Sequence, residues 1–320
     1  MDEAAFLQKN AEKWEQFDEL LRDDAADPDR LADLYVELSD DLAYAQTFYP
    51  DSDTTRYLND LASRAHQEVY QTQSETWGRL RTFWTEELPA VLATTRTAQL
   101  LSLVIFALAM GVGTLSAAYD PGFVRLILGD AYVNSTLASI EAGDPMAVYK
   151  EMHQVPMFLG IALNNIRVAF YAFAAGLLCS VGTAVVLVQN GIMIGAFQYL
   201  FYEHGLLGKA LLVVYIHGTL EISAIVVAGA AGFVMGNGLL FPGSYPRLVA
   251  FRRSAKKGLK IVVGLVPVFV AAAFLEGFVT RYTQMPIALS LSVIGGSLAF
   301  VVGYFVVYPA LSRRRTPSPE

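Results

Sequence analysis

The sequence predicts an all-α fold with an N-terminal cytosolic helical bundle or hairpin and a polytopic α-helical membrane domain of about six spans. Of its 320 residues, 54% are hydrophobic and only 17% charged, which is unusual for a soluble protein. The charge is also uneven, because residues 1–96 carry 21 acidic and 9 basic side chains and the remaining 224 carry 9 and 14. We therefore expect an acidic cytosolic domain at 1–96, a membrane domain at 97–311 and a basic cytoplasmic tail at 312–320.

Three amphipathic helices are predicted in the acidic domain. The first covers residues 3–21, where aromatic side chains recur on one stripe. The second begins after Asp27-Pro28, a capping residue followed by proline, and ends near Tyr49-Pro50. A third starts at Asp51-Ser52-Asp53 and is expected to run on past Trp84 towards the bilayer. Such a domain is either a structural pedestal or a platform for a cytosolic partner.

The membrane spans are predicted from runs of about 20 mostly apolar residues. The segment Ile192–Tyr202 is short for a crossing and would suit a re-entrant segment. Polar residues at 120–156 predict an extracytoplasmic loop with one or two surface helices. Gln189-Asn190-Gly191 is expected to form a turn that closes the second span. The predicted full spans are Ala98–Tyr119, Asn165–Val188, Ala210–Met235, Gly258–Thr280 and Pro286–Tyr308.

The distribution of lysine and arginine predicts which loops are cytoplasmic. Twelve basic residues fall on one predicted side, including a basic loop at 242–260, and four fall on the other. Both termini are therefore expected in the cytoplasm of a bacterial or archaeal cell, with the chain crossing the cytoplasmic membrane several times. The twelve are Arg79, Arg81, Arg96, Arg247, Arg252, Arg253, Lys256, Lys257, Lys260, Arg313, Arg314 and Arg315, and the four are Arg125, Lys150, Lys209 and Arg281.

Several polar residues within the predicted spans are candidates for a binding site or an intramembrane polar network. Charged side chains inside a span are costly, so they usually face the interior of the bundle or water. His217 and Glu221 are four residues apart and share one helical face. The predicted topology places the candidates in the outer half of the bilayer, lining a polar cleft. The full set is Asn164, Asn165, Arg167, Gln189, Asn190, His217, Glu221 and Glu276.

The residues leave three roles open for this polar set. Arg167 could pair with Glu221 or Glu276 in a network that fixes helix register. The set could instead bind or conduct a ligand, or Glu221 could act as a general base with His217 as acid or orienting group. One His and two Glu fall short of a full zinc ligand set unless water completes it, and no His-Glu-x-x-His motif occurs, so we expect no metal and no cofactor.

Other site classes are excluded by composition. The basic residues are too few and too scattered for nucleic-acid binding. The lone Cys179 allows neither an intramolecular disulfide nor a cysteine-based metal cage. Pairs of small residues at Ala107/Gly111, Gly176/Ser180 and Gly232/Gly236 permit close helix packing, but they do not decide the oligomeric state, so a homo-oligomer stays open.

The chain resembles the stage II sporulation protein M family (SpoIIM, DUF95) over nearly its whole length. In the front part the resemblance rests on Leu34-Tyr35, Asp41-Leu42-Ala43, Tyr49-Pro50-Asp51-Ser52, Tyr57-Leu58-Asn59 and Ala65-His66. In the membrane part it rests on Asn164-Asn165-Ile166-Arg167, Gln189-Asn190-Gly191, His217-Gly218-Thr219-Leu220-Glu221, Gly229-Ala230-Ala231-Gly232 and Glu276-Gly277-Phe278-Val279-Thr280.

This resemblance implies a membrane scaffold or assembly component at the cell envelope, because the family's namesake anchors peptidoglycan-degrading partners during engulfment. Many relatives are encoded beside an RDD-type membrane protein, a DUF58 protein and a MoxR-type AAA+ ATPase, which are the partners it implies beside the lipid bilayer. Two alternatives remain open: a transporter or channel-like protein that uses the outward-facing cleft, and an intramembrane hydrolase that uses His217 and Glu221.

Overall fold

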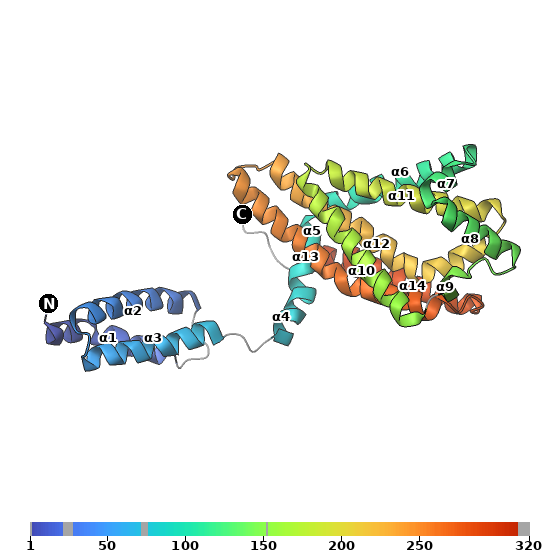
Figure 1. The fold of residues 1–320 in the computed structure, drawn as a ribbon. Helices are drawn as coiled ribbons and strands as arrows, with labels where there is room; N and C mark the ends of the chain where they lie inside the picture. Colours follow the sequence, from blue (N-terminus) through green and yellow to red (C-terminus); the bar gives the residue numbers. More distant parts are fainter. Residues whose placement is uncertain (1, 22–27, 72–75, 152, 313–320) are drawn as a thin grey trace. The chain divides into compact units, whose positions relative to one another are not determined.

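The computed structural model describes residues 2–21, 28–71, 76–151 and 153–312, which form two compact units, Met1–Arg81 and Thr82–Glu320. Every regular element in these described ranges is a helix (Figure 1). Within the part of the chain that the structure describes, six helices are long and apolar enough to cross a membrane. The predicted all-α class with a multi-span membrane domain is thus confirmed.

The first unit packs α1 (Glu3–Leu21), α2 (Pro28–Phe48) and α3 (Asp53–Gln71) around its own core. The aromatic stripe predicted in residues 3–21 lies on α1 and faces this core. Its residues Phe6, Trp14 and Phe17 are at most 4% exposed. The Trp14 indole N–H donates to Asp41 at 2.9 Å, which pairs a buried donor with a carboxylate of α2. The predicted cap at Asp27 lies outside the described residues.

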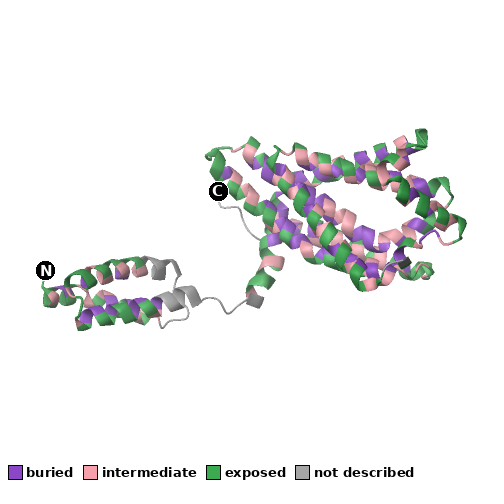
Figure 2. Cartoon of the chain, in the orientation of Figure 1, coloured by how far each residue is buried: buried purple, intermediate pink, exposed green. Residues whose placement is uncertain are grey.

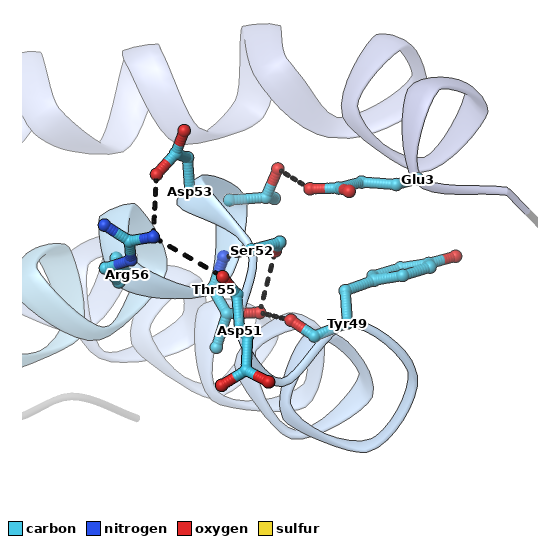
Figure 3. Close-up of polar contacts among 8 residues, drawn as sticks. Glu3, Tyr49, Asp51, Ser52, Asp53, Thr55 and Arg56 are labelled. Atoms are coloured by element: carbon cyan, nitrogen blue, oxygen red, sulfur yellow. Dashed lines mark hydrogen bonds and ion pairs between the residues drawn. The ribbon is translucent and has the colours of Figure 1, made fainter.

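The turn between α2 and α3 follows its sequence signals closely. Helix α2 ends at Phe48, just before Tyr49-Pro50, as the proline rule predicts. Ser52 then caps α3, because its hydroxyl accepts the backbone N–H of Thr55 at 3.1 Å (Figure 3). The Thr55 hydroxyl donates back to the Tyr49 carbonyl at 2.7 Å and closes the turn.

The helical stretch that precedes the first long apolar helix packs within the second unit. Helix α3 covers Asp53–Gln71. After residues 72–75, which lie outside the described ranges, α4 (Thr76–Thr82), η1 (Phe83–Glu87) and α5 (Leu88–Thr94) form one continuous helical stretch past Trp84. Leu88 and Leu92 of α5 are fully buried in a core that they share with α12 and α13. Residues 82–96, which we had assigned to the acidic domain, therefore pack with the membrane helices.

The six long segments of the second unit give an even number of potential crossings. They are α6 (Arg96–Tyr119), α10 with η2 (Gln154–Ala174 and Ala175–Leu177), α11 (Val181–Glu203), α12 (Leu207–Leu240), α13 with η3 (Arg247–Phe274 and Leu275–Thr280), and α14 with η4 and α15 (Ile287–Val301, Val302–Val307 and Tyr308–Ser312). The outward faces of these helices are exposed and the inward faces buried (Figure 2). Exposed apolar side chains such as Leu103, Leu108 and Leu298 are those of a lipid-facing surface.

The boundaries of the second and third spans correct the sequence prediction. The second span begins at Gln154, and the chain reverses at Leu178-Cys179-Ser180, where Cys179 and Ser180 adopt positive φ angles of 50° and 67°. The predicted turn at Gln189-Asn190-Gly191 lies inside α11 and is wrong. Residues 192–202 are consequently the second half of a 23-residue helix rather than a re-entrant segment.

A close approach between α6 and α11 explains why Gly191 does not break the helix. A Cβ atom on Gly191 would lie 2.7 Å from the Phe106 carbonyl oxygen, and one on Gly195 would lie 2.2 Å from that of Met110. These glycines let two backbones touch, which a helical span in a membrane tolerates well. The same applies where Gly176 meets Gly232, so two of the three predicted small-residue pairs face each other.

The loop after α6 is more helical than predicted. It contains α7 (Phe123–Leu128), α8 (Asp130–Glu141) and α9 (Val148–Glu151). Met146 and Tyr149 of this loop are buried against Met157, Phe201 and Val213 of the long helices. The loop helices thus cover one end of the second unit.

Candidate functional site

A cluster of polar side chains lies inside the second unit, beneath the loop helices. His217 and Glu221 come from α12, Glu276 and Thr280 from η3, and Asn165 from α10. One ligand-type atom from each of His217, Glu221 and Glu276 lies within 4.8 Å of the others. We call these five residues the polar cluster.

Glu221 is held by Asn165 across the α10–α12 interface. The amide nitrogen of Asn165 donates to Oε1 of Glu221 at 2.6 Å. His217 and Glu221 lie on one face of α12 because residues four apart in a helix are neighbours. The sequence therefore placed both side chains correctly with respect to each other, and α10 supplies a donor that fixes the carboxylate.

His217 is held from the opposite side by η3. Its ring is 4% exposed, and Nδ1 contacts the Thr280 hydroxyl at 2.9 Å. Nε2 lies 3.7 Å from Oε1 of Glu276, beyond hydrogen-bonding distance. Both partners belong to a π-helical turn at Leu275–Thr280, and π-helical turns are often found at functional sites.

Two tyrosines of the loop helices complete the surroundings of the cluster. The Tyr149 ring packs edge-on against His217, with 5.7 Å between ring centroids. Burial raises the pKa of the Tyr149 phenol well above its usual 10, and the Glu276 carboxylate raises it further. Burial also raises the pKa of Tyr132, although a hydrogen bond to Thr136 opposes this. Both phenols are therefore protonated and neutral at physiological pH.

A small cavity lies next to the two tyrosines, although none of the residues predicted to line an outward cleft borders it. A cavity of about 20 Å³ lies beside Tyr132, Tyr149 and Phe201, which is room for about one water molecule. A larger cavity of about 640 Å³ lies elsewhere in the unit, between α5, the end of α12 and the start of α13. It is lined by basic side chains, including Arg253, Lys256, Lys257 and Lys260.

Four predicted site residues lie outside the polar cluster. Asn164 and Gln189 are exposed, and Asn190 donates to the Val186 carbonyl within its own helix. Arg167 is also exposed and contacts Tyr171, with a hydrogen bond of 3.4 Å and its guanidinium 5.4 Å from the ring centroid.

The predicted pairing of Arg167 with Glu221 or Glu276 is therefore wrong. Positions 165 and 167 are two residues apart and point to different sides of α10, so Asn165 faces the cluster and Arg167 does not. Glu276, by contrast, does meet His217, with 3.7 Å between Oε1 and Nε2.

The cluster coincides with the part of the chain that matches a known family. Residues 102–281 match the family model described as Stage II sporulation protein M. The chain belongs to this family. The match runs from α6 to the end of the fifth span and contains the whole polar cluster.

The front part of this SpoIIM-family chain matches a different model, over residues 4–71, described as a domain of unknown function (DUF8413). The resemblance to the SpoIIM family was expected over nearly the whole chain, whereas the SpoIIM model matches the membrane part. No significant match was found among curated proteins or among solved structures.

Sequence reasoning missed Thr280 and the two tyrosines as members or neighbours of the site. Thr280 lay within the quoted motif Glu276-Gly277-Phe278-Val279-Thr280, so its place in a family motif was an available signal. Tyr132 and Tyr149 carry no comparable signal, because only the fold of the loop brings them to the cluster.

Proposed function

We propose that this SpoIIM-family membrane protein is a scaffold or assembly component of the cell envelope that binds a partner membrane protein through one face of α10. The observation that supports it is the position of Arg167. This residue lies thirteen residues after the start of its span and ten before the end, about 20 Å and about 15 Å along the helix.

A charged side chain at that depth needs a partner. Insertion of arginine at the centre of a span costs about 2.5–3.5 kcal/mol, and arginines in spans almost always face protein or water. Arg167 forms no ion pair within the described residues, and Asn164 beside it is exposed too. A carboxylate in a span of another protein would complement this face, which we call the α10 face.

The partner that suits this face best is the RDD-type membrane protein implied by the family resemblance. The DUF58 protein and the MoxR-type AAA+ ATPase would instead meet the acidic helical unit of residues 2–71. A second copy of the chain is a poorer occupant of the α10 face, because a two-fold contact there would bring two Arg167 side chains together.

The experiment is co-purification of the tagged chain with its co-expressed RDD-type neighbour. We expect Arg167→Met to remove the partner while the variant still inserts and unfolds at the same temperature. Lys209→Met is the matched control, since Lys209 is an exposed basic residue near the start of α12. The proposal fails if Arg167→Met retains the partner as well as the control does.

A photo-crosslinking residue at Leu163, which is 68% exposed, tests the same face in the membrane. Leu103 on α6, which is 51% exposed, is the lipid-facing control. A protein adduct from Leu163 and none from Leu103 is expected. Adducts between two copies of the chain would instead identify the α10 face as a homo-oligomer interface.

A further inference from the structure

We propose that His217, Glu221 and Glu276 bind a divalent transition-metal ion, with zinc preferred. The ligand atoms of the three residues lie within 4.8 Å of one another, and Nε2 of His217 is 3.7 Å from Oε1 of Glu276. Zinc bonds to nitrogen and oxygen are about 2.0–2.2 Å long, so tetrahedral ligands lie about 3.3–3.6 Å apart. The His217–Glu276 distance is close to this range, and the widest ligand spacing would have to contract by up to about 1.2–1.5 Å to hold an ion.

The hydrogen bonds around the three residues favour metal binding. Nδ1 of His217 contacts the Thr280 hydroxyl, and a proton held there leaves the Nε2 lone pair free to point at the carboxylates. The Asn165 amide holds one oxygen of Glu221 at 2.6 Å. Metal sites commonly use such outer hydrogen bonds to fix the tautomer and orientation of their ligands.

A bound cation would also balance the charge of the cluster. Two carboxyl groups lie close together in an apolar domain, and the Glu276 side chain is only 15% exposed. The ion pairs of the described residues give Glu221 and Glu276 no lysine or arginine. Because unpaired carboxylates are costly to bury, a bound dication would balance the charge that Arg167 was predicted to balance.

The ligand set also limits which metal fits. One imidazole with two carboxylates suits zinc or manganese better than magnesium or calcium, and zinc binds such ligands more tightly than manganese. Three protein ligands leave a fourth position, which a water molecule occupies in zinc sites of this kind. The site is distinct from the α10 face, so it does not depend on the proposed scaffold role.

The test uses the full chain in detergent, purified with a tag that contains no histidine. After removal of metal by EDTA and incubation with zinc, mass spectrometry of metal content should give about one zinc per chain. The unfolding temperature should fall with EDTA and recover with zinc, because a ligand that binds only the folded state stabilises it. Zinc absorption spectra should show a first shell of nitrogen and oxygen at about 2.0–2.2 Å.

Variants then locate the ion. His217→Gln, Glu221→Gln and Glu276→Gln should each lower zinc affinity at least about tenfold. The double variant Glu203→Gln/His204→Gln removes an exposed carboxylate and an exposed imidazole at the end of α11, so it is the matched control and should bind zinc like the wild type.

Three results would overturn the proposal. The first is wild-type protein that holds no zinc and whose unfolding temperature ignores both EDTA and zinc, a result that needs no variant to fold. The second is Glu276→Gln that binds zinc as tightly as the Glu203→Gln/His204→Gln control. The third is magnesium that stabilises the protein as much as equimolar zinc, since a site with imidazole should discriminate between them.

Discussion

At the scale of single residues, neighbouring polar side chains of α10 have different surroundings. Asn165 reaches Glu221 inside the domain, whereas Arg167 lies on the exposed α10 face beside Tyr171. The helix repeat of 3.6 residues separates positions two apart by more than half a turn, which accounts for the difference. Burial of one polar residue in a span therefore says little about the residue two positions on.

Replacement of Thr280 should affect the polar cluster without removing any of its ionisable groups. Thr280→Val keeps the side-chain volume but leaves the buried Nδ1 of His217 without its partner, at a cost of about 1–3 kcal/mol. Thermal unfolding of the detergent-solubilised protein measures this change. Thr280→Ser retains the hydroxyl and should recover most of the loss; equal destabilisation by both variants would contradict the hydrogen-bond explanation.

Arg167 and Glu221 should behave independently in a double-mutant cycle. Since Arg167 contacts Tyr171 and Glu221 contacts Asn165, the unfolding free energies of Arg167→Met and Glu221→Gln should add to within about 0.5 kcal/mol. Asn165→Leu with Glu221→Gln should not be additive and provides the positive control. A coupling energy above about 1 kcal/mol between Arg167 and Glu221 would show that the two residues interact, as the sequence suggested.

At the scale of elements, glycines decide how closely the membrane helices approach. Gly113 of α6 and both Gly191 and Gly195 of α11 sit where a Cβ atom would meet backbone atoms of the facing helix. A turn was expected at Gly191 because Gln-Asn-Gly is a common turn sequence. In α11 the same glycine serves a backbone contact, and the reversal occurs at Cys179 and Ser180 instead.

Substitution at Gly195 should separate the effect of the backbone contact between α6 and α11 from the effect of helix propensity. Gly195→Ala places a methyl group 2.2 Å from the Met110 carbonyl oxygen and should cost about 1–3 kcal/mol through displacement of α6. Gly111→Ala is the matched control, because no atom lies within 4 Å of its added Cβ and alanine favours the helix. Thermal unfolding of both variants checks this; equal stabilities would mean that the helices are not in contact there.

At the scale of the whole molecule, six long helices bring the two ends of the membrane domain to the same side if each helix crosses once. The loop helices, the turn after α11 and the turn after η3 then share the opposite side. The basic residues that line the 640 Å³ cavity then lie on the same side as the ends, the side that the positive-inside rule predicts to be cytoplasmic.

Cysteine labelling should test this orientation. In a Cys179→Ser background, Ser135→Cys on α8 should react with an impermeant reagent from outside intact cells, and Ser244→Cys should react only after permeabilisation. Both positions are exposed. Labelling of Ser244→Cys from outside would reverse the orientation and place the loop helices in the cytoplasm.

The sequence by itself determined the helical class, the helices of the acidic unit and the identity of His217, Glu221 and Glu276 as candidates, because hydrophobic periodicity, capping residues and buried charge are local signals. Only the tertiary structure decided which polar residues meet. Contacts such as Asn165 with Glu221 and His217 with Thr280 join positions 56 and 63 residues apart, and they depend on helix rotation and on backbone contact at glycines. A local pattern specifies neither the rotation of a helix nor its backbone contacts. Arg167 was therefore predicted to lie in the cluster, although its position on α10 faces away from it.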